Sequence, residues 1–479
     1  MIYFLIALAL LAITFVAIFL VRAARFKPPV VSESSPEKVS VDSDLAICAL
    51  GELVKCKTIS CRDSSMEDDE EFDKLLSKLP RLYPNLFAKC DFTKLEDRAI
   101  LLKWKGKHEG DPAVLMAHYD VVPANESEWE KPPFDAVIEN GVMWGRGTLD
   151  TKVTVNGILF AAETLISDGF VPERDIYFAF SGGEEINGLG AAHIVDYFKN
   201  NRINPSMVLD EGGAVVEGAF PGVTKPCALV GIAEKGILNL RYEVRSEGGH
   251  ASAPSRETPI GILSRACTKV ESNPFKCHVT KPAADMFDTI GRHSSFIYRV
   301  IFANRRIFTP VLDSMASKRG GEMNALMRTT VAFTQMSGSS AANVIPPEAS
   351  MVSNIRLNPE DTVESAVEYI RGVIGDDRVK ISVINGTNPS RISRTDTEGW
   401  QKLSRAIEDT WQGSVVSPYL MLQCSDSRHY GAISDKVYRF SAMALSAEER
   451  STIHGNNERI TLDAAVKAVE FFIRLIKQL

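Results

Sequence analysis

Residues 113–120 read AVLMAHYD, an uncharged run of five apolar residues followed by histidine, tyrosine and aspartate. A run of this length and composition is typical of a strand buried inside a sheet. It is followed by a helical pattern at 153–167, an apolar strand at 176–180, a helix at 190–199 and a strand at 207–209. This alternation predicts an α/β fold with a mainly parallel sheet and helices on both of its faces. Ligands bind at the carboxyl ends of the strands in such sheets, so the chemistry is expected there.

The pattern changes after residue 236. Residues 238–244, LNLRYEV, alternate as in a half-buried strand, and they are followed by a helix at 259–270. A strand at 350–357, a helix at 362–374 and a strand at 379–384 complete a small α+β sandwich inserted in the larger domain. Between them, 275–336 is rich in Phe, Ile and Met. We expect helices that pack on the sandwich, with an apolar substrate wall as the alternative.

The length of 479 residues is too great for one ordinary core, so two domains behind a leader are expected. The changes in pattern predict a transmembrane anchor at 1–21, a linker at 22–43 and an inserted domain at 237–384. The larger domain is then formed by two separate segments, 44–236 and 385–479.

The leader is uncharged from residue 1 to residue 21, which is long enough to cross a bilayer. Its match to the basic start and to the small-residue cleavage site of a signal peptide is poor, so we expect an uncleaved single-pass anchor. The basic residues Arg22, Arg25 and Lys27 favour a cytoplasmic body. Two glycosylation sequons, at Asn125 and Asn385, would matter only on the lumenal side. The side of the membrane is therefore left open.

Net charge and cysteine spacing argue against nucleic-acid binding and against a zinc site formed by cysteines. The net charge of -7 provides no basic stripe, which argues against nucleic acid as a partner. The eight cysteines are irregularly spaced without a C-x-x-C pair, which argues against zinc held by thiolates.

Acidic residues and histidines stand at the predicted strand ends and strand-to-helix turns. Each has an ordinary explanation when taken alone, such as a surface pair, a helix cap or an exposed turn. One metal cluster explains them all, and imidazole with carboxylate ligands suits zinc, or cobalt or manganese in its place. The residues concerned are His118, Asp120, Asp150, Glu184, Glu185, Asp210 and His454.

Several longer motifs occur in the same order: AHYDVVP at 117–123, GRGTLD at 145–150, GHASAP at 249–254, NVIPP at 343–347 and SDSR at 425–428. With these motifs the chain, from about residue 45 to its end, resembles the aminoacylase/carboxypeptidase S family of dizinc metallopeptidases. Within that family it is most similar to the N-fatty-acyl-amino-acid synthase/hydrolase branch. One departure is Thr151, where close relatives carry a second aspartate that is not a ligand.

The resemblance implies two zinc ions, one held by His118, Asp150 and Asp210 and the other by Asp150, Glu185 and His454. It implies that Glu184 is the general base and that Asp120 steadies His118. It also implies that the larger domain is catalytic and that the inserted domain, 237–384, is a lid or dimerisation domain. In this lid, His250 would contact the scissile carbonyl oxygen, and Asn343 and Arg356 would hold the substrate carboxylate. Lids of this family often pair, so a homodimer is also implied in which His250 of one chain reaches the site of the other chain.

Three functions remain open at this stage. The first is hydrolysis, and under some conditions formation, of the amide bond of N-acyl amino acids. The second is a carboxypeptidase or dipeptidase that acts on short peptides. The third is a membrane-held binding module without catalysis, which the complete set of ligand residues disfavours.

Overall fold

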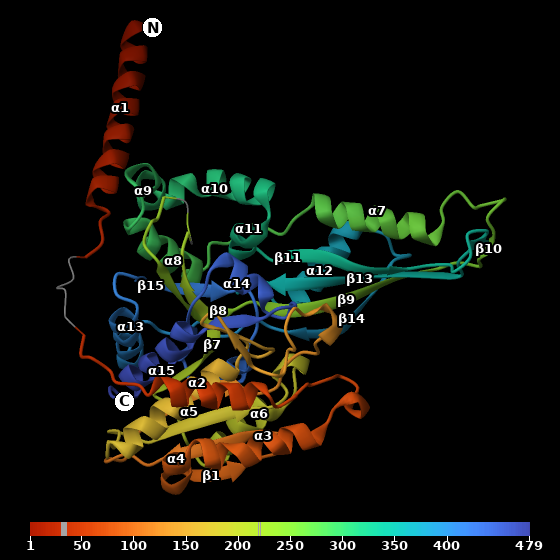
Figure 1. Cartoon of the computed structure of the whole chain (residues 1–479). Coiled ribbons are helices and arrows are strands. Elements are labelled where there is room, and N and C mark those ends of the chain that lie inside the picture. The colour runs from red at the N-terminus through yellow and green to blue at the C-terminus, as the bar shows by residue number, and fades with distance from the viewer. Residues whose placement is uncertain (30–35, 219, 221) are drawn as a thin grey trace.

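The computed structural model describes the chain from residue 1 to residue 479 except for 30–35, 219 and 221. Helix α1 (Ile2–Arg25) stands out from the body at one end of the molecule (Figure 1). By length and composition it can cross a membrane, and a signal sequence near an N-terminus has the same features. The helix extends four residues beyond the predicted end at residue 21, because its last turn packs on the body and leaves Ala23 fully buried. The predicted linker, 22–43, includes 30–35, which lie outside the described residues.

The central sheet has eight strands in the order β1-β2-β6-β3-β7-β16-β8-β15. The pairs β3–β6, β3–β7, β7–β16 and β8–β15 are parallel, so the prediction of a mainly parallel sheet is confirmed. Strands β3 and β6 are buried along their whole length, as expected for strands covered on both faces. The strands are β1 (Asp91–Lys94), β2 (Ile100–Trp104), β3 (Ala113–His118), β6 (Ile176–Ser181), β7 (Met207–Val216), β8 (Cys227–Glu234), β15 (Val415–Met421) and β16 (Val437–Ala444).

Helices cover both faces of this sheet. Leu115 of β3 lies in a core formed with one helical layer, and its neighbour Val114 lies in a second core formed with the opposite layer. Successive strand residues point to opposite faces, so one strand contributes to both cores. The first layer is α2 (Ser43–Val54), α3 (Asp69–Leu82), α4 (Pro84–Lys89), α5 (Lys152–Ser167), α13 (Glu398–Thr410) and α15 (Leu462–Ile476); the second is α6 (Gly190–Asn200) with η4 (Asp426–Ala432).

The inserted segment forms a four-stranded antiparallel sheet in the order β11-β13-β9-β14. Two helices cover one of its faces and share a core with it, which is the predicted α+β sandwich. These elements are β9 (Gly236–Arg245), β11 (Thr330–Ser337), β13 (Glu348–Leu357), β14 (Lys380–Thr387), α7 (Pro259–Ser272) and α12 (Val363–Ile374). At the far tip of this unit, β10 (Gly249–His250) pairs with β12 (Val344–Ile345) (Figure 1).

The apolar stretch at 275–336 is mostly helical, but the expectation that its helices pack on the sandwich is wrong. Helix α8 (Lys281–Arg292) shares a core with β8 and β15 at the edge of the central sheet. Its residues Met286, Phe287 and Ile290 recur at helical spacing and belong to the same buried cluster as Leu420 of β15. Helices α9 (Phe296–Ala303), α10 (Arg305–Arg319) and α11 (Gly321–Met327) follow.

Short elements complete the chain. A small antiparallel sheet joins β4 (Val137–Glu139), β5 (Val142–Trp144) and β17 (Arg459–Thr461). The remaining elements are α14 (Ala447–Thr452), η1 (Ser64–Met66), η2 (Glu126–Glu128) and η3 (Glu184–Ile186).

A buried ion pair joins two neighbouring strands of the central sheet. Glu234 at the end of β8 contacts Arg439 of β16, and each side chain is only 1% exposed. We expect Arg439→Met to lower the free energy of unfolding by about 3–5 kcal/mol, because it leaves a buried carboxylate without its cation. Denaturant unfolding followed by tryptophan fluorescence measures this loss.

The matched control is Arg394→Met, which removes an exposed pair with Asp396. An exposed pair contributes at most about 1 kcal/mol. Equal losses in the two variants would show that the buried pair does not stabilise the sheet.

Candidate metal centre

The site lies where three neighbouring parallel strands end. His118 is the last residue of β3, Glu184 and Glu185 follow β6 in η3, and Glu211 lies within β7. Asp150 precedes α5, and His454 follows α14. The carboxyl ends of parallel strands meet at one edge of a sheet, which explains why residues so far apart in sequence converge.

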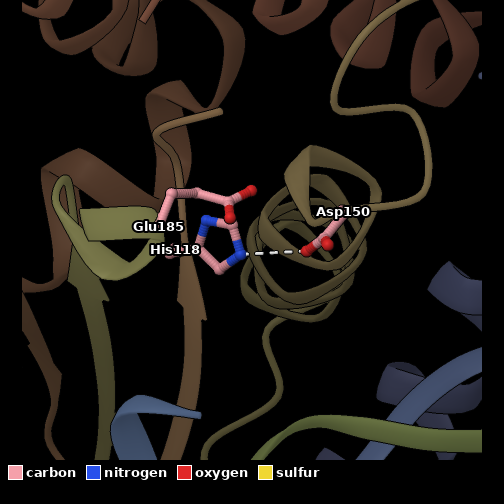
Figure 2. A group of neighbouring side chains, drawn as sticks. All are labelled: His118, Asp150 and Glu185. Carbon is pink, nitrogen blue, oxygen red and sulfur yellow. Dashed lines mark hydrogen bonds and ion pairs between the residues drawn. The ribbon is translucent and has the colours of Figure 1, made fainter. Parts of the chain in front are cut away.

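Asp150 lies between two imidazoles. Its Oδ1 is 3.0 Å from Nε2 of His118, and its Oδ2 is 2.9 Å from Nε2 of His454. Nε2 of His454 is also 3.2 Å from Oε2 of Glu185. Ligand atoms of His118, Asp150 and Glu185 all lie within 4.8 Å of one another, and Figure 2 shows the three side chains converging. The structure thus brings together four of the five predicted metal ligands.

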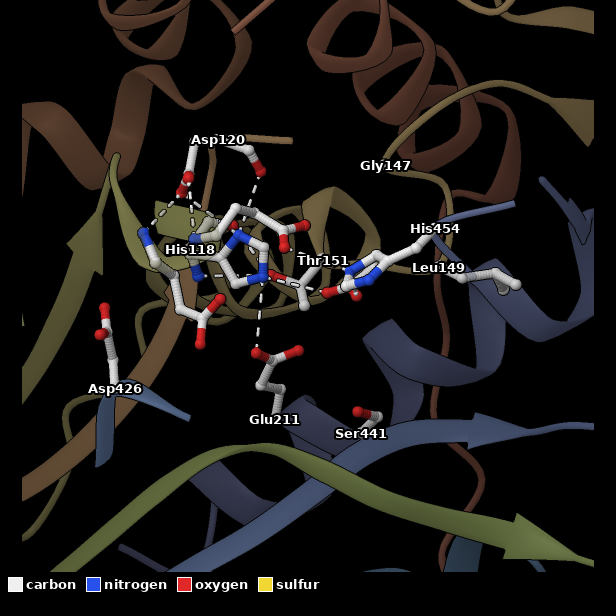
Figure 3. A network of polar contacts seen from close by, with 12 residues as sticks. His118, Asp120, Gly147, Leu149, Thr151, Glu211, Asp426, Ser441 and His454 are labelled. Carbon is white, nitrogen blue, oxygen red and sulfur yellow. Dashed lines mark hydrogen bonds and ion pairs between the residues drawn. The ribbon is translucent and has the colours of Figure 1, made fainter. Parts of the chain in front are cut away.

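The fifth predicted ligand, Asp210, does not join this group, and the adjacent Glu211 lies beside His118 instead. Glu211 forms a second group with His118 and Glu184, and its Oε1 is 3.4 Å from Nε2 of His118 (Figure 3). Asp210 instead accepts a hydrogen bond from the backbone N–H of Ser427 at 2.9 Å. Adjacent strand residues point to opposite sides, so only one of the two acids can face the histidine.

Asp120 fixes both the histidine and the glutamate turn. Its backbone oxygen is 3.0 Å from Nδ1 of His118, which orients the ring with Nε2 towards Asp150. Its buried carboxylate accepts hydrogen bonds from the backbone N–H groups of Glu184 at 3.1 Å and of Glu185 at 3.2 Å. Ser60 Oγ donates to the same carboxylate at 2.6 Å. Asp120 therefore contacts the glutamate turn as well as His118, which the sequence did not indicate.

Glu458 anchors the turn that carries Asp150, a role that sequence reasoning missed. It is fully buried and accepts hydrogen bonds from Nη1 of Arg146 at 2.8 Å and from the backbone N–H of Leu149 at 2.7 Å. Because Glu458 lies four residues after His454, it ties the Asp150 turn to the loop that carries the second histidine. The hydroxyl of Thr151, the residue that departs from the family pattern, donates to the backbone oxygen of His118 at 2.8 Å.

Carboxylates crowd this site. The pKa of Glu184 lies well above its ordinary value: burial is the main cause, the charge of His118 opposes it, and Glu211 and Asp426 add to it. Burial, followed by the charge of Asp150, likewise raises the pKa of Glu211 well above its ordinary value. Burial also raises the pKa of Asp426 to about 7. Buried carboxylates at this density require cations if they are to remain ionised.

The donor set fits divalent metal ions. Oε1 of Glu185 is buried and has no hydrogen-bond partner among the described residues, as expected for an atom that faces an ion. All the converging donors are imidazole nitrogens or carboxylate oxygens, which suits zinc. The nearby Cys424 is not a member of either group, and its thiol donates to the backbone oxygen of Lys235 at 3.3 Å.

The predicted lid residues fall in two places. Arg356 on β13 lines a cavity of about 470 Å³ together with Arg428 and Asn187, which follows η3. Arg428 belongs to the SDSR motif at 425–428, but no role of this residue could be predicted from the sequence. His250 and Asn343 lie at or beside the far tip of the four-stranded unit, where β10 pairs with β12 (Figure 1). Within one chain the structure therefore does not bring His250 and Asn343 to the metal ligands, because β9 and β13 carry the tip away from the central sheet.

The exchange of Asp210 for Glu211 can be tested by metal content. We expect Glu211→Gln to lower bound zinc from about two ions per chain to about one, because a neutral amide replaces a charged ligand. Asp210→Asn should keep both ions, since the amide oxygen still accepts the hydrogen bond from Ser427. Elemental analysis of the purified variants measures both values, and the opposite pattern would restore Asp210 as the ligand.

Comparisons with known proteins find relatives that match most of the chain. The family model described as peptidase family M20/M25/M40 matches residues 114–478. The chain is 36% identical to a probable carboxypeptidase S-like 2 of Dictyostelium discoideum, over 94% of this chain and 89% of that protein. It is also 36% identical to the N-fatty-acyl-amino acid synthase/hydrolase PM20D1 of Xenopus tropicalis, over 90% of this chain and 85% of that protein.

Solved structures share the fold. The M20 family metallo-carboxypeptidase Sso-CP2 of Sulfolobus solfataricus matches with a TM-score of 0.65 and 18% identity, over 90% of this chain and 98% of that one. Human carnosine dipeptidase 1 matches with a TM-score of 0.64 and 14% identity, over 91% of this chain and 96% of that one.

Proposed function

Since this chain belongs to peptidase family M20/M25/M40 and is a zinc-dependent hydrolase, we propose that it hydrolyses the amide bond of N-acyl amino acids with two zinc ions. Under a high concentration of products the same site would form that bond. The observation that carries the proposal is the position of Asp150, whose two oxygens each contact a different imidazole. A carboxylate placed in this way could be shared by two metal ions, each of which would also be held by one of the imidazoles.

The ligands divide into two sets that share Asp150. One zinc would be held by His118, Asp150 and Glu211, and the other by Asp150, Glu185 and His454. This assignment replaces Asp210, the ligand expected from the family pattern, by Glu211. The support is the convergence of these donors and the orphaned oxygen of Glu185.

The protein's own groups would handle the protons. Zinc held by these ligands would lower the pKa of a nearby water molecule and polarise the amide carbonyl. Glu184 would take a proton from that water as its oxygen bonds to the carbonyl carbon, and would deliver the proton to the amide nitrogen as the C–N bond breaks. Asp120 positions Glu184 by holding the backbone N–H groups of the η3 turn. Burial keeps the pKa of Glu184 high, which makes it a stronger base than an exposed glutamate.

The free carboxylate of the substrate would bind Arg356, with Arg428 in the same cavity. A guanidinium offers a planar pair of donors that matches a carboxylate, so it fixes the register of the substrate. His250 and Asn343 could reach a substrate only from a second copy of the chain or after movement of the lid. We propose the former, a homodimer formed through the inserted segment, 237–384.

Two substrate classes fit a pocket that recognises a carboxylate. The relative from Xenopus tropicalis carries the name of an N-fatty-acyl-amino acid synthase/hydrolase, which favours N-acyl amino acids. The relative from Dictyostelium discoideum is named a probable carboxypeptidase, which favours short peptides. Both substrate classes present an amide bond close to a free carboxylate.

Side-by-side assays separate the two classes. We expect kcat/KM for N-oleoyl-phenylalanine to exceed that for Gly-Leu by at least about tenfold, since an apolar acyl chain adds binding energy that a glycine cannot supply. The Glu184→Gln variant, prepared in the same way, controls for contaminating hydrolases. Faster cleavage of Gly-Leu would make the chain a dipeptidase instead.

We also propose that α1 is retained as a membrane anchor. The support is its last turn, which packs into the body: Ala23 is fully buried, and the ring of Phe26 lies 4.5 Å from the guanidinium of Arg292 on α8. A segment destined for removal would not be expected to form part of the folded core.

A further inference from the structure

Helix α10 carries an apolar stripe that nothing in the described chain covers. Ile307, Val311 and Met315 are 52%, 52% and 61% exposed. They are spaced at i, i+4 and i+8, so they lie on one face of the helix. Ala316, on the opposite side, is buried against the body. On α9, Ile297 is also apolar and is 75% exposed.

Contacts with α1 fix the position of this stripe. The rings of Phe19 on α1 and Phe308 on α10 are 5.8 Å apart and meet edge to face. Nδ2 of Asn304, between α9 and α10, donates to the backbone oxygen of Phe19 at 3.3 Å. Figure 1 shows α10 lying crosswise to α1, on the side of the body from which α1 projects.

The position of α10 relative to a lipid bilayer follows from the length of α1. A helix rises about 1.5 Å per residue, so roughly 20 residues cross a hydrocarbon layer of about 30 Å. The uncharged run of α1 ends at Val21, and Arg22 and Arg25 stand in its last turn. If α1 spans a bilayer, Phe19 lies near the hydrocarbon boundary on the side of the bilayer that faces the body. Phe308, which contacts it, then lies at the same boundary.

The charges beside the stripe match a membrane surface. Arg306 and Lys318 on α10 are exposed, and neither forms an ion pair with a described residue. The only acid in 296–319 is Asp313, which is paired with Arg328. Basic residues beside an exposed apolar face are typical of helices that lie in the interface of a bilayer with anionic lipids.

We propose that α10, with the adjacent face of α9, lies in the headgroup layer of the same membrane that holds α1. This inference rests on the proposed role of α1 as a retained anchor. The apolar stripe would enter the acyl boundary, while Arg306 and Lys318 contact anionic headgroups. The body would then be held at the bilayer by two contacts, α1 and α10, which fixes its orientation to the membrane.

Photo-crosslinking in vesicles tests this directly. The full chain is reconstituted into phosphatidylcholine vesicles with or without phosphatidylserine, with p-benzoylphenylalanine in place of Ile307, Val311 or Met315. Control positions are Met66 and Phe92, which are also exposed and apolar. Phe92 is on β1, at the opposite end of the body from α10 (Figure 1). Lipid adducts are measured by mass spectrometry.

We expect lipid adducts at the three α10 positions to exceed those at the controls by about tenfold, and to increase further with phosphatidylserine. Adducts between two chains at these positions would show that a second copy covers the stripe. Adducts at the control level would show that the stripe faces water. Either result overturns the proposal.

Two further readouts separate this proposal from its premises. The intact mass of the purified chain shows whether α1 is retained. Hydrolysis of a soluble short-chain N-acyl amino acid reports the proposed activity, and we expect it to be unchanged by Ile307→Asp, Val311→Asp and Met315→Asp combined. The control variant combines Leu45→Asp, Met66→Asp and Ile138→Asp at other exposed apolar sites. Normal hydrolysis with no α10 adduct would refute only the membrane contact.

Discussion

Replacing Glu184 by glutamine should lower kcat by about three orders of magnitude while the zinc content stays at about two ions per chain. Glutamine has nearly the same shape but cannot accept a proton from water. The backbone N–H of residue 184 would still donate to Asp120, so the turn should keep its conformation. KM should change little, because Glu184 is not expected to contact the parts of the substrate that bind.

This experiment also decides between two roles for Glu184, since its carboxylate belongs to one of the two groups able to hold a metal ion. Loss of one zinc ion in the variant would make Glu184 a ligand and not the base. A near-normal kcat would remove it from the mechanism altogether. Glu173→Gln, at an exposed pair with Lys107, is the matched control and should leave both kcat and zinc unchanged.

Asp150→Asn should have the largest effect on metal binding. The carboxylate of Asp150 serves both imidazoles, so its loss removes a shared ligand from both proposed zinc positions. An amide is neutral, and its nitrogen cannot act as a ligand. We expect fewer than about one zinc ion per chain and a loss of activity of at least about four orders of magnitude. Elemental analysis and the N-oleoyl-phenylalanine assay measure the two effects.

The control for Asp150→Asn is Asp168→Asn, at the opposite end of the same helix α5. It changes the same residue type at an exposed position and should retain full zinc and activity. Retention of both zinc ions by Asp150→Asn would contradict the bridging role.

The strands and helices around the site could be read from the sequence because burial dictates their composition. Strands β3 and β6 are covered on both faces, and this burial appears in the sequence as the uninterrupted apolar runs at 113–117 and 176–180. The convergence of His118, Asp150 and Glu185 follows from the same feature, since all three stand at the ends of such strands or at the start of the next helix.

The choice between Asp210 and Glu211 could not be read in the same way. Both acids lie in β7, and a shift of the strand register by one residue would exchange the faces of the sheet to which they point. The pairing of β3 with β7 ends at Leu209 of β7, and the pairing of β16 with β7 shifts its register directly after Asp210, so Glu211 lies at an irregularity of the sheet. The family pattern pointed to Asp210, and only the three-dimensional contacts place Glu211 beside His118.

The positions of the lid residues and of α8 depend on tertiary packing. Composition at 275–336 showed apolar helices but not their partner, and the partner proved to be the edge of the central sheet. Likewise, the motifs GHASAP and NVIPP do not predict the distance between the tip of the inserted unit, formed at the ends of β9 and β13, and the proposed metal ligands. Arg356 lies closer to the base of the same sheet and does line the cavity.

The central claim is that two cations are held on either side of Asp150, beside Glu184. Crystals of the zinc-loaded protein, measured at the zinc absorption edge, test it most directly. The account predicts two anomalous peaks, both about 2.0–2.2 Å from an oxygen of Asp150. One peak should also contact His118 and Glu211, and the other Glu185 and His454. A single peak, or peaks that do not contact Asp150, would contradict it.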